Sequence, residues 1–591
     1  MTNTLKHIFT AVIISLLLSF AVQAQNAPQA DDIIFKALTD ELTRNSTDLV
    51  LNNYKPPFYI SYQLYDIKSL LIKATMGSIR QVQDIPTRIS NVRAMVGDYS
   101  LNDENFIGMP SMSSGGYLPV PLDNDYAGIR RAFWISTDRI YKSALQTYEQ
   151  KLTALKQQNK TESETIDDYT KAGPLTYIST EPDFKVDRPK LENLAKEVSA
   201  IFTTYGDIAA STAYVSVVKA WTYQVTSEGA RIKSPVNMVA LMVNAYSQAE
   251  DGEPIIDHLL YFAPTPDQLP PIEKVKLEVK QMADNLVNLR KAPAIKDSYN
   301  GPVIFEGEAI AELFIQKLFS PNAGLYATRE QVRAVERQGY EQNAANKFDN
   351  RIGQKICSAN LNIKAISKTR TFNGIPLVGA FDIDVEGTTP PDELVLVQNG
   401  MLKTLLNGRT PTTQVKVSNG HMRLIRAGGG YTKFKAPGVI NITFDNGKPA
   451  ANFRREILDE YARNGLEYIY VVKKLQVFNT AMINVMSSTA NRNLTLSKPI
   501  AIYKVSTKTG EEQLVRSAIV NDFQTAAFKQ VPFGTNEQMV YNTAAPRMGL
   551  EIPASFIVPQ ALVFEDISIE PDKGITKAKL PVVPNPVLAV K

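Results

Sequence analysis

A single cysteine, Cys357, is the feature that most limits how this chain of 591 residues folds. One cysteine forms no disulfide within the chain, so the folded state must be stabilised by packing. Beyond about 250–300 residues a single hydrophobic core stops growing, and a chain divides into domains. The sequence therefore predicts at least two domains, each with its own core.

Histidine is almost as scarce, with His7, His258 and His421 in the whole chain. A catalytic zinc site normally takes three protein ligands, drawn mainly from His, Cys, Asp and Glu. So few nitrogen and sulfur ligands argue against the usual zinc sites. We expect Cys357 to be a small buried residue, His258 a partly buried structural histidine and His421 a turn residue.

The charges of the chain nearly balance, since 64 Lys and Arg accompany 60 Asp and Glu for a net charge of +4. A surface that binds nucleic acid usually shows a basic excess gathered on one face. No such cluster of basic residues occurs along the sequence, and we expect no nucleic-acid partner.

The first residues have the pattern of a secretory signal peptide. Lys6 and His7 precede an uncharged apolar run from Ile8 to Val22, and the small residues of Val22-Gln23-Ala24 suit a cleavage site. The run is shorter than the roughly 20 residues that span a bilayer as a helix. We expect residues 1–24 to be removed and the protein to be exported, periplasmic or extracellular, without a stable membrane span. A retained N-terminal anchor is the alternative.

The pattern of apolar residues differs between the two halves of the chain. Residues 31–292 are expected to form an α/β domain, with an inserted helical and loop region at about 100–185. Residues 298–591 are expected to form a domain rich in antiparallel strands and glycine turns, so the predicted class is α+β. Apolar periodicity predicts helices at 31–48, 139–158, from 187, at 272–289, 309–319 and 454–464, and strands at 58–76, 87–96, 214–225 and 238–246.

The segment from Gly301 to Phe319 holds the residues of most chemical interest. Here an apolar strand leads directly into a helix that carries Glu306, Glu308 and Glu312. Glu308 and Glu312 are four residues apart and share a helix face. Three carboxylates could bind a hard cation or perform acid–base chemistry. Acidic residues are also favoured in the first turn of any helix, and on spacing alone this structural explanation is the stronger one.

Further motifs accompany this segment in order along the chain. They are Ser227-Glu228-Gly229, GAFDIDVEG at 379–387, LVLVQNGMLKTL at 394–405, SNGHMR at 418–423 and REILDEYARNGLEYIYV at 455–471. Together with residues 301–319 they resemble the motifs of the TldD/PmbA family, metallopeptidases in which a strand leads into an HExxxH zinc-binding helix. The resemblance covers most of residues 187–580 and implies that family's fold.

The family motif falls on Gly307, Glu308 and Glu312 of this chain. Gly307 stands at the first zinc-binding His, Glu308 at the catalytic Glu and Glu312 at the second His. Catalytic members take a third ligand from a Cys that would fall within 541–551, where this chain has none. The resemblance thus implies a divergent member without zinc ligands and without a bound metal cofactor, in which Glu308 has no metal-bound water to act on.

The family as known includes paired subunits, one with zinc and one without. The resemblance therefore implies a zinc-less subunit of the cell envelope that binds extended peptide and pairs with a catalytic TldD-like paralogue. Glu306, His421 and Arg423 are candidate cleft residues. Two alternatives remain: an active metallopeptidase with a non-standard metal site at Glu306, Glu308 and Glu312, and a stand-alone envelope protein that binds a peptide or another polymer.

Overall fold

The computed structural model describes residues 32–575, apart from 109–117, 160–165, 182, 322–323, 335–347, 428–429, 478–495 and 546–551, together with a few residues beyond 575. The expected signal peptide, residues 1–24, lies outside the described residues. Helices and antiparallel strands occur in both halves, which confirms the predicted α+β class. No helix within these ranges has the length and hydropathy that a membrane span requires.

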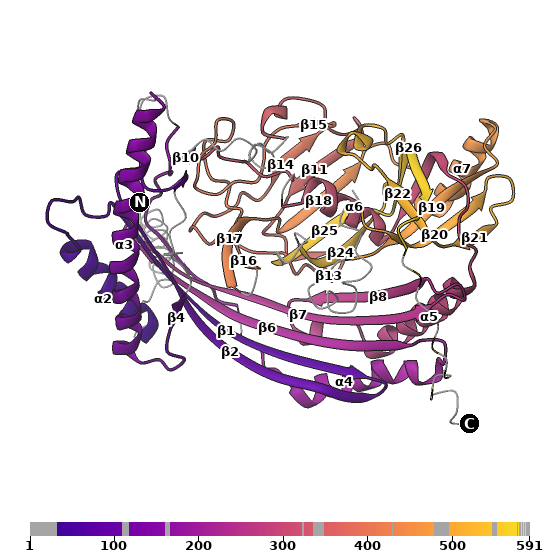
Figure 1. The fold of residues 1–591 in the computed structure, drawn as a ribbon, viewed down its shortest axis with the longest axis horizontal. Helices are drawn as coiled ribbons and strands as arrows, with labels where there is room; N and C mark the ends of the chain where they lie inside the picture. The colour runs from indigo at the N-terminus through magenta and orange to yellow at the C-terminus, as the bar shows by residue number, and fades with distance from the viewer. Residues whose placement is uncertain are drawn as a thin grey trace, which may run out of the picture.

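The first half of the chain forms one long, curved sheet (Figure 1). Its strand order is β4-β2-β1-β6-β7-β5, and β8 pairs with the later part of β7. Neighbouring strands run antiparallel, except that β5 is parallel to β7. The strands are β1 (Tyr59–Thr75), β2 (Ser78–Met95), β4 (Leu118–Pro119), β5 (Leu175–Ile178), β6 (Ala210–Thr226), β7 (Ala230–Gln248) and β8 (Pro254–Ala263).

Helices cover one face and one end of this sheet. They are α2 (Ile33–Asp48), α3 (Tyr126–Gln157), α4 (Arg188–Ala200) and α5 (Ile272–Lys291). α4 and α5 share a core with β1, β6 and β7, whereas α2 and α3 pack with the opposite ends of the strands. Figure 1 shows α4 below the sheet and the second half of the chain above it, so the sheet lies between these two layers.

The second half of the chain contains two larger sheets. Their strand orders are β15-β14-β11-β18-β25-β24 and β21-β20-β19-β9-β26-β22, and β23 also pairs with β26. The strands are β9 (Tyr299–Glu306), β11 (Leu361–Ala365), β14 (Leu394–Gln398), β15 (Met401–Leu402), β18 (Val439–Phe444), β19 (Tyr468–Leu475), β20 (Pro499–Ser506), β21 (Glu512–Val515), β22 (Ala518–Asn521), β23 (Phe533–Gly534), β24 (Gln538–Ala545), β25 (Ile552–Pro559) and β26 (Ala561–Pro571). Most pairs are antiparallel, but β18 runs parallel to β25 and β9 parallel to β19.

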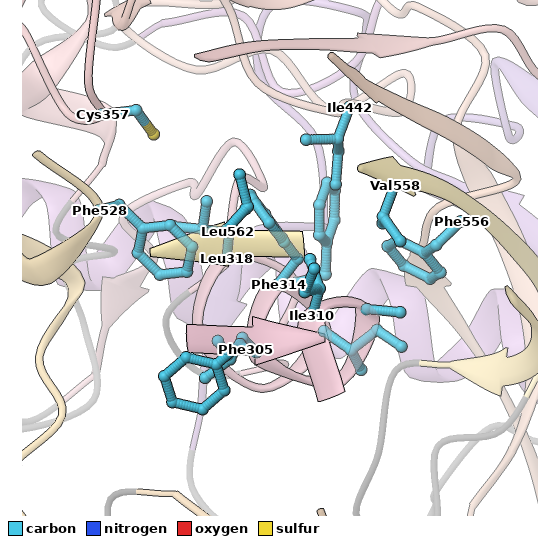
Figure 2. Packing of buried hydrophobic residues seen from close by; sticks show 14 of the residues in the cluster. Phe305, Ile310, Phe314, Leu318, Cys357, Ile442, Phe528, Phe556, Val558 and Leu562 are labelled. Carbon is cyan, nitrogen blue, oxygen red and sulfur yellow. The ribbon is translucent and has the colours of Figure 1, made fainter. Parts of the chain in front are cut away.

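Helix α6 (Glu308–Leu318) lies between these two sheets and is almost entirely buried. Figure 2 shows Ile310, Phe314 and Leu318 of the helix among side chains of both sheets. Strand β9 alternates its side chains, so Phe305 faces α6 while Ile304 faces α7 (Ala450–Arg463) on the other side. The buried thiol of Cys357 belongs to the same core as α6, as expected from its chemistry.

The predicted helices and strands appear with shifted ends. α3 begins at Tyr126, capped by Asp125, whereas the sequence predicted a helix from residue 139. Trp134 and Ile135 are exposed on its first turns, so the apolar pattern there does not mark one buried face. β1 lies within its predicted range, whereas β2, β6 and β7 are longer than predicted. The added ends of β6 and β7 are richer in polar residues and less buried, so apolar periodicity does not mark them.

Candidate functional site

The junction between β9 and α6 is built on Gly307. This residue has φ +59° and ψ −135°, a conformation that side chains strongly disfavour. An added Cβ would meet nothing closer than the carbonyl oxygen of Lys473 at 3.9 Å, so backbone conformation rather than space requires glycine here. The position that the resemblance assigns to the first zinc-binding His therefore offers no donor atom.

Glu308, the first residue of α6, faces a lysine from a distant strand. The Lys474 ammonium lies 3.4 Å from Oε1 of Glu308 and 2.9 Å from Oδ1 of Asp257, and it also donates to the carbonyl oxygen of His258. Asp257 and His258 belong to β8 in the first half of the chain. The Lys474 ammonium thus joins the two halves at the N-terminus of α6.

An irregularity in β19 places Lys474 there. The register between β19 and β20 shifts on either side of Lys474, and such bulges turn a side chain away from its regular direction. Val472, two residues earlier, pairs with Phe305 of β9, just before Gly307. The bulge therefore aims the lysine at the start of the helix that β9 leads into.

The charges of this cluster shift one another's proton affinity. Burial works to lower the pKa of Lys474, but Asp257 and Glu308 outweigh it and hold the pKa above its ordinary value. Burial raises the pKa of Glu308, and the charges of Asp257 and Glu312 add to that rise while Lys474 opposes it. The lysine stays charged, so the cluster holds a permanent cation.

Glu312, which the resemblance assigns to the second His position, is fully buried and accepts hydrogen bonds from neutral groups. The hydroxyl of Tyr541 on β24 donates to its Oε1 at 2.9 Å, and Nε2 of Gln316 donates to its Oε2 at 3.1 Å. Gln316 in turn bonds to the hydroxyl and the backbone N–H of Ser497. Tyr541 begins the region 541–551, to which the resemblance assigns the third ligand; residues 546–551 lie outside the described part.

Glu306 does not join Glu308 and Glu312. Its carboxylate accepts hydrogen bonds from the guanidinium of Arg454 on α7, with Nε at 2.9 Å. Arg454 also pairs with Glu512 of β21. The three carboxylates that the sequence grouped together therefore have three different sets of partners: an arginine, a lysine, and a tyrosine with a glutamine.

His421 and Arg423 belong to a second buried cluster. Nδ1 of His421 lies 2.7 Å from the carbonyl oxygen of Asn419, and Nε2 lies 3.1 Å from the Ser367 hydroxyl. Burial lowers the pKa of His421 to about 4, with a smaller contribution from Arg423. The Arg423 guanidinium lies 4.0 Å from the centre of the Phe381 ring, and burial lowers its pKa to about 9. His421 is thus a buried, neutral, hydrogen-bonded residue near a turn.

Motifs that lie far apart in the sequence meet in this second cluster. Glu228, of the 227–229 turn, pairs with Arg409 at 2.8 Å, and Oε2 of Glu386 accepts from the Arg409 backbone N–H at 2.6 Å. Arg93 of β2 lies 3.2 Å from Glu386. Burial, together with the charge of Glu386, raises the pKa of the neighbouring Asp384 to about 7. These contacts bind the first half of the chain to the second.

The donor set at the start of α6 does not fit a zinc ion. Zinc sites use Cys, His or carboxylate ligands around an accessible centre, whereas here Gly307 has no donor and Glu308 already faces an ammonium. Among the residues that the structure describes, no group of three or more His, Cys, Asp and Glu side chains is placed to hold a metal. The carboxylates are held by hydrogen bonds and one fixed cation instead.

Comparisons with known proteins agree with this architecture. Residues 298–496 match the family model of the PmbA/TldA metallopeptidase C-terminal domain. None of the curated proteins matches the chain in sequence. Strand β9 and the buried helix α6 lie within this matched range. This part of the chain is therefore similar to the C-terminal domain of a metallopeptidase. The match places residues 298–496 in the TldD/PmbA family.

Solved structures extend the shared fold to about nine tenths of the chain. A Thermotoga maritima protein described as a modulator of DNA gyrase has TM-score 0.58 and 14% identity, over 91% of this chain and 100% of that chain. TldE from Thermococcus kodakarensis has TM-score 0.53 and 13% identity, over 90% and 99%. A Bacteroides thetaiotaomicron protein, also described as a modulator of DNA gyrase, has TM-score 0.54 and 11% identity, over 92% and 99%.

The sequence patterns did not indicate three residues of the site. Lys474, Asp257 and Tyr541 are separated from Glu308 along the chain and carry no motif of their own. The one available signal was the ending of YIYVVKKL, where two lysines close an otherwise apolar strand. A buried lysine requires a nearby carboxylate, so this ending could have indicated a charge pair.

Proposed function

We propose that the protein is a zinc-less member of the TldD/PmbA family that acts in the cell envelope, binds extended peptide and pairs with a catalytic paralogue. The contact of the Lys474 ammonium with Glu308 and Asp257 carries this proposal. A divalent ion on Glu308 would lie against this charge. Two unit charges about 4 Å apart repel by about 4 kcal/mol at the effective dielectric of a protein. Lys474 thus supplies the positive charge of a metal without its water or its Lewis acidity.

The position of the site supports a role in peptide binding. Asp257 lies on β8, which follows β7 in the first sheet, and Tyr541 lies on β24, the last strand in the order of its own sheet. β8 and β24 contact each other. The site therefore lies where the first sheet meets the end of the sheet that contains β24. Sheet edges bind extended peptides through main-chain hydrogen bonds and need no catalytic group for this.

Pairing and export rest on the family resemblance and on the sequence. A subunit without zinc requires a paralogue that retains the metal if the pair is to cleave peptide. One of the similar structures is named TldE. The apolar run that ends at Val22 supports export, because it is followed by small residues suited to cleavage.

Metal analysis of protein purified from its native envelope tests the proposal. We expect the isolated chain to carry far less than one zinc per molecule. Zinc is expected in fractions that contain a second, copurifying chain, and mass spectrometry should identify peptide bound to the complex. One zinc per isolated chain would overturn the proposal. Bound peptide without a second chain would refute the pairing and leave peptide binding intact.

A substitution separates this proposal from an active peptidase with a non-standard metal site. Glu308→Gln should leave peptide cleavage by the purified complex unchanged, because Glu308 activates no water in the proposed protein. If Glu308 were the general base, the same substitution would abolish cleavage. The structure gives the non-standard site no support, because Glu306 is bound by Arg454 apart from Glu308 and Glu312.

A further inference from the structure

A cavity of about 170 Å³ opens beside the Asp257–Lys474 pair, where the two halves of the chain meet. β8 and α5 form its walls on one side, and β20 and β21 form them on the other; these elements lie together at the right of Figure 1. An engineered cavity of about 150 Å³ holds a benzene molecule. This cavity therefore has room for one side chain of about six heavy atoms.

The lining combines apolar walls with carboxylates. The apolar residues are Leu259, Met282, Leu289, Ile500, Ala501 and Leu514. Glu278 stands on the α5 wall and accepts a hydrogen bond of 2.5 Å from the Tyr261 hydroxyl. Asp257 stands on the β8 wall. A long aliphatic side chain fits walls of this kind, and a positive charge at its end fits the carboxylates.

The lysine in the wall does not cancel this preference. An ammonium has three N–H donors, and Lys474 directs them to Asp257, Glu308 and the carbonyl oxygen of His258. Lys473 pairs with Glu512 at 2.9 Å. Lys274, 3.8 Å from Glu278, is largely exposed and holds it only loosely. Among the described residues that line the cavity, Asp257 and Glu278 are carboxylates and Lys474 is the one cation.

We propose that this cavity binds the alkylammonium side chain of a lysine in the bound peptide. The inference rests on the proposed peptide binding and adds a residue preference to it. The methylene groups of the lysine lie along the apolar walls, and its ammonium meets Glu278, which forms a charge-assisted hydrogen bond with it.

Matched peptides test this preference. An extended seven-residue peptide, acetylated and amidated at its ends, is prepared with either lysine or norleucine at each position in turn, and binding is measured by calorimetry on the full chain or its complex. We expect at least tenfold tighter binding for lysine at one position. A third series, with norleucine and a free amino terminus, distinguishes a side-chain ammonium from the peptide's own N-terminus.

Two substitutions on α5 provide the matched pair of variants. Glu278→Gln should bring the ratio of lysine to norleucine affinities close to one, whereas Glu273→Gln, 79% exposed on the same helix, should leave the ratio unchanged. Ala501→Leu, which narrows the cavity, should weaken both peptides. Because the readout is a ratio, a general loss of stability does not imitate the effect.

Each outcome has a distinct meaning. Equal affinity for lysine and norleucine at all positions would overturn the cavity assignment and leave peptide binding standing. A lysine preference that survives Glu278→Gln would also overturn it, and a preference shown only by the free amino terminus would assign the cavity to the end of the peptide instead. Absence of binding by every peptide would refute the proposed function itself.

Discussion

The hydroxyl of Tyr541 donates a hydrogen bond of 2.9 Å to Oε1 of Glu312, although 229 residues separate them in the chain. Glu312 has no exposure to solvent, so this bond and that from Gln316 replace water around a buried carboxylate. The bond also fixes β24 against α6. The residues that the resemblance assigns to the second ligand position and to the region of the third are thereby linked by a hydrogen bond.

Tyr541→Phe should lower the free energy of unfolding by about 1–3 kcal/mol, because a buried acceptor loses a donor. Urea denaturation measures this change. Tyr461→Phe is the control, since the buried Tyr461 hydroxyl has no hydrogen-bond partner within the described part of the chain. Tyr461→Phe should leave the free energy of unfolding unchanged or raise it slightly. Equal effects of the two substitutions would contradict the role given to Tyr541.

Lys474→Met should lower the free energy of unfolding by about 3–5 kcal/mol, because Asp257 and Glu308 lose their shared cation in a buried site. Adding Asp257→Asn to this variant should recover part of the loss. Lys142→Met is the matched control: Lys142 pairs with Asp138 at 2.8 Å, but both side chains are about half exposed. Exposed pairs contribute about 0–1 kcal/mol. A cost no larger than that of the control would contradict the buried pair.

Lys474→Ala should also create a site for a hard cation. With the ammonium gone, the oxygens of Asp257 and Glu308 can bind a divalent ion such as Mn²⁺. Ligand binding to the folded state raises its stability, by about 2.7 kcal/mol at a ligand concentration 100 times Kd. Thermal unfolding with and without Mn²⁺ should show a higher Tm for the variant and no change for the parent. The variant that also carries Asp257→Asn should lose the response, and an equal response of the parent would count against a fixed cation.

Arg409→Ala should weaken the contact between the two halves of the chain. The Arg409 guanidinium is only 2% exposed; it donates to Glu228 at 2.8 Å and lies 4.1 Å from the centre of the Tyr169 ring. Its removal leaves the Glu228 carboxylate without its cation, with hydrogen bonds from the Tyr99 hydroxyl and the Ala172 N–H, at a cost of about 3–5 kcal/mol. Hydrogen exchange should show lost protection around both Tyr169 and Glu228. Arg455→Ala, at an 89% exposed arginine, should change stability by less than about 0.5 kcal/mol.

His421 should make stability depend on pH below neutrality. Its pKa falls from 6.5 in the unfolded chain to about 4 in the fold, so the unfolded state binds the proton more strongly between these values. The contribution of neutral His421 to the free energy of unfolding is complete above pH 6.5. It declines by about 3 kcal/mol as the pH falls to 4. Asp384, with its pKa raised to about 7, works in the opposite direction in the same window.

Comparison with His421→Gln isolates the histidine from Asp384. The difference in the free energy of unfolding between parent and variant should shrink as the pH is lowered from 7 to 4, when measured by urea denaturation at each pH. A difference that stays constant across this range would show that His421 is not held neutral by burial.

Local sequence patterns predicted the helices and strands. The partners of Glu308 depend on contacts between residues far apart in the chain. Apolar periodicity placed the helix that starts at Glu308 within a residue of its observed start, because that information lies within a few turns of chain. Gly307 could be placed on the family motif for the same reason. The partner of Glu308 could not be found this way, because Lys474 reaches it through a bulge in β19 and meets Asp257 from another sheet. No short segment of the sequence predicts either the bulge or the contact between the two sheets.

The backbone at Gly307 limits which residues this position can carry. A histidine at this position would have to adopt φ near +59°, which costs an L-residue about 1–2 kcal/mol or more, or else the turn would have to be rebuilt. A zinc site at the start of α6 would also require the removal of Lys474 and the exchange of Glu312 inside a packed core. In the zinc-less protein proposed above, changes at three positions would therefore have to accumulate before a zinc ion could bind at the start of α6.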